Sequence, residues 1–234
     1  MRTLLVSGHV YSMSERFATA VLVEDSTIAW IGNDAGADVH VSDVDAVVDL
    51  DGDLLTPGFV HLNDPHPSAD LGFVYGERSS IRIADRWVDQ AWDAGAGEPL
   101  AVVPRDPCRL RSRIAAGAPT ALVPDHHEPS GWGTIRAAVH EIAPAERVSA
   151  RAAFSALTRG AWRLLGAPDR GVLAVGADAT FVRWAVDDLV VEAPDERISN
   201  WSTDPRAATP GLPPLGRDDA LPTARSVWRH GVEG

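Results

Sequence analysis

Apolar residues gather in short runs over the first fifty positions of the chain. Turn residues, chiefly Gly, Asp and Ser, separate these runs, and no helical period links them. The four clearest runs are Leu4–Val6, Ala20–Val23, Ile28–Ile31 and Ala46–Leu50. Runs of this length bounded by turn residues predict a small antiparallel sheet or sandwich over residues 3–50.

The Pro57-Gly58 pair marks a change in the pattern. Pro fixes its own φ and Gly accepts conformations that a Cβ forbids, so the pair redirects the chain. Beyond it, the apolar runs Leu100–Val103 and Thr120–Val123 alternate with segments of helical period. Alternation of strands and helices predicts parallel strands joined by right-handed crossovers.

Capping signals and apolar spacing place the helices of this second part. Residues 149–165 begin with Ser149 as an N-cap and carry apolar residues three to four positions apart. Residues 130–141 and 106–117 predict two more helices, and residues 83–93 are a weaker candidate. A last strand is expected near residues 224–232, after a proline-rich loop.

Composition and charge narrow the class of protein. The chain has 234 residues, 45% of them hydrophobic, and a formal net charge of −12. This charge opposes binding to nucleic acid or to an anionic membrane surface, and no apolar run approaches the ~20 residues of a membrane span. The first residues lack a signal peptide's apolar region, and Cys108 is the only cysteine. These features predict a globular cytoplasmic protein with no nucleic-acid and no membrane partner.

The residues around the Pro-Gly pair carry a family resemblance. The run Thr56-Pro57-Gly58-Phe59-Val60 resembles the Pro-Gly-Phe-(Ile/Val)-Asp-x-His-x-His segment of the amidohydrolase superfamily, whose members are metal-dependent hydrolases of C–N bonds. Five further stretches match the family in order: residues 117–125, 132–139, 149–162, 171–184 and 201–206. Of these, 149–162 and 201–206 resemble the branch that includes N-substituted formamide deformylases. The resemblance implies an α/β plus β fold. In it, residues 1–56 and 167–234 build one composite β-sandwich, and residues 57–166 form the inserted barrel segment.

The inserted segment is too short for a complete barrel. Ser149 comes 89 positions after Val60, whereas eight strand-helix units need roughly 200 residues or more. By the resemblance, Val60 ends the first barrel strand, while Leu100–Val103 and Thr120–Val123 are the seventh and eighth. We therefore expect a truncated parallel remnant of a TIM barrel, with three strands. Such a remnant leaves sheet edges uncovered, which favours a homodimer or a pairing with a full-length relative.

The metal-binding pattern of the family is altered in this chain. The positions of its paired histidines carry Asn63 and Pro65, and the ligands of strands five and six have no counterpart. All 21 basic residues are arginine. A carbamylated lysine, which bridges two metal ions in many relatives, is therefore excluded, because a guanidinium does not become a neutral nucleophile.

Two polar clusters follow predicted strands and leave two interpretations open. His61 and His66 follow the first strand, and Asp125 and His127 follow the last. The first interpretation is a catalytically impaired family member that binds no metal and acts through self-association or protein binding. The alternative is a residual mononuclear zinc hydrolase of an amide or formamide, with Asp125 as the catalytic base and His61, His66, Asp125 and His127 as the ligands. Solvated or carbonyl-bonded loop residues are the ordinary outcome for such positions, and the substrate is not readable.

Overall fold

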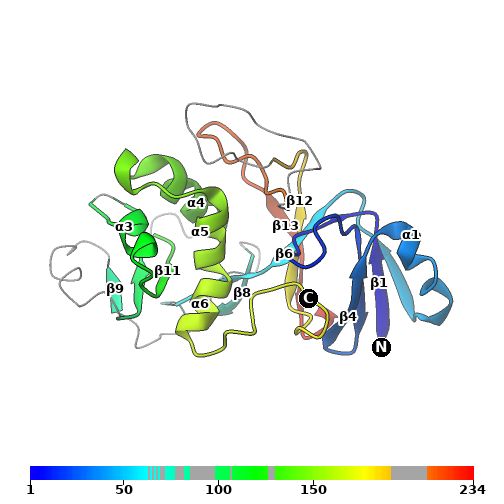
Figure 1. Ribbon diagram of the computed structural model, residues 1–234. Helices are drawn as coiled ribbons and strands as arrows, with labels where there is room; N and C mark the ends of the chain where they lie inside the picture. The colour runs from blue at the N-terminus through cyan, green and yellow to red at the C-terminus, as the bar shows by residue number, and fades with distance from the viewer. Residues whose placement is uncertain are drawn as a thin grey trace. The chain divides into compact units, whose positions relative to one another are not determined.

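The computed structural model divides into two compact units (Figure 1). It describes residues 1–62, 64, 66, 68, 72–76, 82–84, 98–105, 107–125, 130–190 and 210–234. Unit 1 comprises Met1–Gly58, Val172–Pro214 and Pro222–Gly234, and unit 2 comprises Phe59–Gly171 and Leu215–Leu221. The chain therefore leaves unit 1 directly after the Pro57-Gly58 pair.

A four-stranded sheet in the order β4-β3-β1-β5 forms part of unit 1. Its strands are β1 (Arg2–Val6), β3 (Ala20–Glu24), β4 (Thr27–Gly32) and β5 (Ala46–Asp49). Strand β3 is antiparallel to β1 and to β4, as predicted. Strand β5 is parallel to β1, so the all-antiparallel prediction is wrong there. The connection through α1 (Asp34–Ala37) and the 3-10 turn η1 (Val41–Asp43) is long enough for the crossover that parallel pairing needs.

The second sheet of unit 1 combines strands from both parts of the chain. Its order is β14-β13-β12-β6-β2. The strands are β2 (His9–Val10), β6 (Leu54–Pro57), β12 (Phe181–Ala185), β13 (Thr223–Arg229) and β14 (Val232–Glu233). Figure 1 shows β12 and β13 beside β6, far earlier in the sequence. One buried cluster contains Leu5 and Val21 of the first sheet together with Leu55, Phe181 and Trp228 of the second. The two sheets thus share a hydrophobic core.

Unit 2 contains five described strands, all in parallel pairs. They are β7 (Phe59–His61), β8 (Phe73–Gly76), β9 (Arg82–Ala84), β10 (Leu100–Val102) and β11 (Thr120–Leu122). One sheet has the order β11-β10-β9, and the other pairs β7 with β8. The described strands do not form a closed barrel.

The three-strand expectation is therefore wrong in number. Strands β8 and β9 were missed because they lie within a stretch that lacks a clear apolar alternation. The predicted helix at 83–93 begins inside β9, and its remainder, residues 85–93, lies outside the described residues. Val60, Ala101 and Ala121 nevertheless share one buried cluster, so β7, β10 and β11 lie against a common core.

Short helices pack on the strands of unit 2. They are α3 (Leu110–Ala115), α4 (Gly131–Arg136) with its π-helical continuation η3 (Ala137–Glu141), the 3-10 turn η4 (Pro144–Glu146), α5 (Ala150–Leu157) and α6 (Arg159–Leu164). Ser130 and Ser149 cap α4 and α5 through their hydroxyls, as predicted for Ser149. The predicted helix 149–165 divides at Thr158, whose hydroxyl donates to the Phe154 carbonyl at 2.8 Å. No helix among the described residues has the length and apolar character needed to cross a membrane.

Candidate functional site

The ends of three strands in unit 2 carry the polar residues that the sequence singled out. His61 is the last residue of β7, Arg105 follows β10, and Asp125 follows β11. Active sites of barrels and other parallel α/β folds lie at the carboxyl ends of the strands. This edge is therefore where a site of the expected kind would stand.

Asp125 is paired with an arginine. Nη2 of Arg105 forms a salt bridge with Oδ2 of Asp125, and the two side chains retain only 24% and 31% of their exposure. Partial burial makes such a pair stronger than one on the open surface, because less water screens it. A guanidinium keeps its proton in proteins, so a permanent positive charge stands beside this carboxylate.

Strand register explains how the pair forms. Strands β10 and β11 are parallel, with Val102 opposite Leu122. Arg105 and Asp125 each lie three positions beyond these residues. The two side chains therefore leave equivalent levels of neighbouring strands. Arg105 was not among the residues predicted from the sequence, although its position after the predicted strand at 100–103 matches that of Asp125 after the strand at 120–123.

His61 is buried beside an aromatic side chain. His61 is only 6% exposed, and its ring centroid lies 5.3 Å from that of Phe73, on the paired strand β8. Phe73 also contacts Phe59, with ring centroids 5.9 Å apart. His61 is thus held as part of the packing between β7 and β8.

The other predicted ligands are placed less favourably or lie outside the description. His66 is exposed, and its backbone N–H donates to Oδ1 of Asp64 at 2.8 Å, which is a local Asx turn. His127 lies outside the described residues. Among the residues that the structure describes, no three His, Cys, Asp or Glu side chains stand close enough together to hold a metal ion.

These described residues do not fit a mononuclear zinc centre. Zinc takes four ligands, of which at least three come from the protein in a catalytic site. The one aspartate with the expected position is instead neutralised by Arg105. The ion pair joins residues that follow the neighbouring strands β10 and β11.

Comparison with known families and structures adds to this geometry. A model of the amidohydrolase family matches residues 84–233, more than half of the chain. No curated protein matches it. An amidohydrolase from Thermotoga maritima MSB8 is similar in structure, with a TM-score of 0.59, 14% identity and coverage of 99% of both chains.

Two further solved structures are similar to the same extent. An uncharacterised metal-dependent hydrolase from Pyrococcus furiosus has a TM-score of 0.59 and 11% identity, covering 78% of this chain and 98% of that one. Enamidase, described as a new member of the amidohydrolase superfamily, has a TM-score of 0.59 and 10% identity, covering 100% of this chain and 95% of that one. At such identities the likeness concerns the fold alone.

Proposed function

The chain belongs to the amidohydrolase family, and we propose that it is a catalytically impaired member that acts through self-association or the binding of another protein. The observation that carries this proposal is the ion pair between Arg105 and Asp125. By resemblance, Asp125 stands where the family has a general base beside its metal. In this chain, the Asp125 carboxylate is already paired with the Arg105 guanidinium.

Coulomb energies support the loss of the metal. Like unit charges ~4 Å apart repel by about 4 kcal/mol at an effective dielectric constant of ~20, and a divalent ion doubles this. A full set of protein ligands supplies roughly 10–16 kcal/mol to a structural zinc ion, enough to overcome such a repulsion. The described residues offer no group of three donors, and the Arg105 guanidinium offsets part of the attraction that the Asp125 carboxylate would give a cation.

We also propose finer assignments of the fold. The shared core of the two sheets in unit 1 supports their assignment as the composite β-sandwich of the family. Unit 2 has five described strands in parallel pairs, fewer than the eight of a complete barrel. This supports a truncated TIM-barrel remnant. The matches at 149–162 and 201–206 support a placement near the formamide deformylase branch.

Exposed apolar side chains support self-association. Strand β5 is the outer strand of its sheet, and its Val47 is 51% exposed. Val39 and Val41, in the segment before it, are 70% and 50% exposed. An outer strand with apolar side chains is a surface that proteins usually cover by pairing. We propose a second copy of the chain as the partner. A full-length relative is the alternative partner.

Size-exclusion chromatography with light scattering tests the self-association. The wild-type chain at micromolar concentration should have twice the mass of one chain, and Val47→Asp should shift it towards the monomer. Val175→Asp is the matched control, because Val175 is 62% exposed but lies far along the chain from β5. A wild-type monomer, or equal dissociation by both variants, would contradict the proposal.

The alternative, a residual mononuclear zinc hydrolase of an amide or formamide, makes a different demand. It requires His61, His66, Asp125 and His127 to converge on one ion. The His61 ring would have to move away from Phe73, and the salt bridge between Asp125 and Arg105 would have to break. No described contact favours this function over the first.

A further inference from the structure

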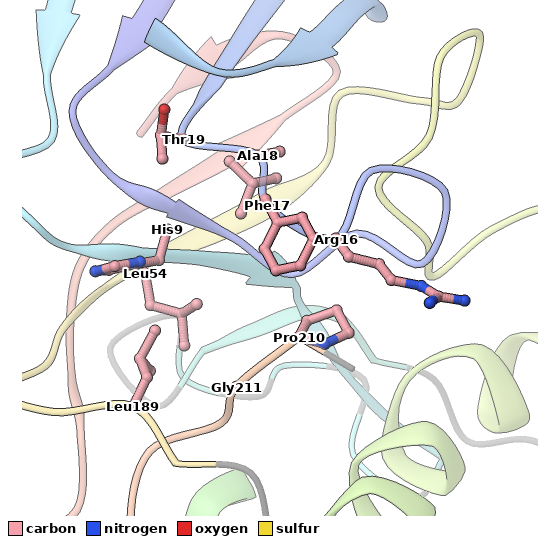
Figure 2. Close-up of a pocket in the computed structure, with 10 residues that line it drawn as sticks. His9, Arg16, Phe17, Ala18, Thr19, Leu54, Leu189, Pro210 and Gly211 are labelled. Atoms are coloured by element: carbon pink, nitrogen blue, oxygen red, sulfur yellow. The ribbon is translucent and has the colours of Figure 1, made fainter. Parts of the chain in front are cut away.

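Unit 1 contains a hollow that lies outside the strand ends described above. Its volume is about 280 Å³, and it is lined by residues of β2, β6 and the segments 16–19, 189 and 210–211. Figure 2 shows the side chains around it. None of Arg105, Asp125 and His61 contributes to its lining.

The walls of this hollow are of mixed polarity and include two apolar rings. Phe17 and Pro210 face each other across it in Figure 2, and Leu54 and Leu189 lie to one side. Phe17 is 64% exposed, although large aromatic side chains usually bury most of their surface. A flat apolar molecule between Phe17 and Pro210 would cover this exposed ring.

The charge of the lining is opposite to that of the whole chain. The chain has 33 acidic and 21 basic residues. The lining includes two side chains that can carry a positive charge, His9 and Arg16, and no acidic one. In Figure 2 they stand at opposite ends of the hollow, with the Arg16 side chain extended outward. Both residues are exposed, and both line the hollow. A guanidinium is suited to bidentate binding of a carboxylate.

Backbone hydrogen bonds hold both sides of the hollow in place. On one side, the Val10 N–H donates to the Ala18 carbonyl at 3.0 Å, and the Ala18 N–H donates to the Glu15 carbonyl at 3.2 Å. On the other, the N–H groups of Val190 and Leu212 each donate to the other's carbonyl, at 2.8 and 3.0 Å. A preformed hollow binds a ligand without the cost of ordering its walls.

We propose that this hollow binds a small aromatic carboxylate, with its ring between Phe17 and Pro210 and its carboxylate on Arg16. The volume sets the size, because pockets for drug-sized ligands begin at roughly 300 Å³ and this one lies just below that limit. The ligand is therefore a molecule of a single ring. This site goes beyond the proposed function, because its lining residues all belong to unit 1.

Fluorine NMR of para-fluorobenzoate with the full chain tests the proposal. The ligand signal should broaden on addition of protein, with a dissociation constant on the order of 1 mM, as is usual for so few atoms. The neutral analogue para-fluorobenzamide should bind at least about fivefold more weakly, because it cannot pair with a guanidinium. No broadening, or equal binding of the two compounds, would overturn the proposal.

Three variants locate the binding. Phe17→Ala and Arg16→Gln should each weaken para-fluorobenzoate binding at least about fivefold, through loss of the ring contact and of the charge. Val175→Ala is the control, because it removes an exposed apolar side chain elsewhere in unit 1. Both pocket side chains are exposed, so the thermal unfolding midpoints should stay unchanged. Equal affinity of Phe17→Ala and the control would overturn the assignment.

Discussion

At the scale of single residues, Asp53 holds three segments of unit 1 together. Its side chain is 5% exposed. It accepts hydrogen bonds from Nε of Arg183 on β12 at 2.5 Å and from Nε of Arg225 on β13 at 3.1 Å. Arg225 is 59% exposed and contributes less than Arg183, which is 17% exposed.

We predict that Asp53→Ala destabilises the chain by about 2–4 kcal/mol, because it leaves the Arg183 guanidinium without its anion in a largely buried place. Urea unfolding measures the change. Asp187→Asn, at an exposed position, should change the free energy of unfolding by less than about 0.5 kcal/mol. Equal effects of the two variants would show that Asp53 has no such role.

Arg113 plays a comparable part in unit 2. It is 6% exposed, its Nη2 donates to the Glu98 carbonyl at 2.8 Å, and burial lowers the pKa of its guanidinium. Arg113→Ala would remove this hydrogen bond together with the packing of a buried side chain, at a cost of about 1–3 kcal/mol. Arg111→Ala, at an exposed position of the same helix, should have little effect. Thermal unfolding of the two variants compares them, and a smaller loss for Arg113→Ala would contradict this account.

The residue scale is also where prediction from sequence was least complete. Asp125 could be singled out because a family motif ends on it. Arg105 could not, because an arginine after a strand has many possible partners and only the strand register selects one. The burial of His61 followed from β8, which was itself missed.

At the scale of elements, the contact between α4 and β7 depends on a glycine. A Cβ at Gly131 would lie 2.1 Å from the Phe59 ring. Phe59 cannot easily move, because Trp132 and Phe154 lie against it with ring centroids at 5.3 and 5.9 Å.

We predict that Gly131→Ala destabilises the chain, although alanine favours a helix by up to about 1 kcal/mol over glycine. Overpacking costs about 1–3 kcal/mol and outweighs this gain. In a Phe59→Ala background the ring atoms that meet the added Cβ are absent, so the same substitution should cost less. A double-mutant cycle measured by urea unfolding gives this difference. Additive effects would contradict the proposed contact.

Most elements with a clear periodicity or cap were predictable. Strands β1, β3 and β4 followed from their apolar runs, and the start of α5 followed from Ser149. The direction of β5 was not predictable, because a short apolar run gives no information on which way the chain crosses before it. The break at Thr158 is a local departure of the backbone, with φ −115° and ψ −98°, that apolar spacing does not reveal.

At the scale of the whole molecule, the chain belongs to the amidohydrolase family, and we propose that its site has changed. Both parts of the chain build unit 1, and the parallel strands remain in unit 2. The central claim is that Arg105 supplies the positive charge at Asp125 that relatives obtain from a metal ion. Because Arg105 balances the charge of Asp125, the zinc content of the chain is the property to measure.

Elemental analysis of the chain, purified without an affinity tag and dialysed against micromolar zinc, is the most direct test. We predict far less than one zinc ion per chain, and no difference between the wild type and Asp125→Asn, because the aspartate is occupied by Arg105. One zinc ion per chain that is lost in Asp125→Asn would contradict the claim and establish the metal site instead.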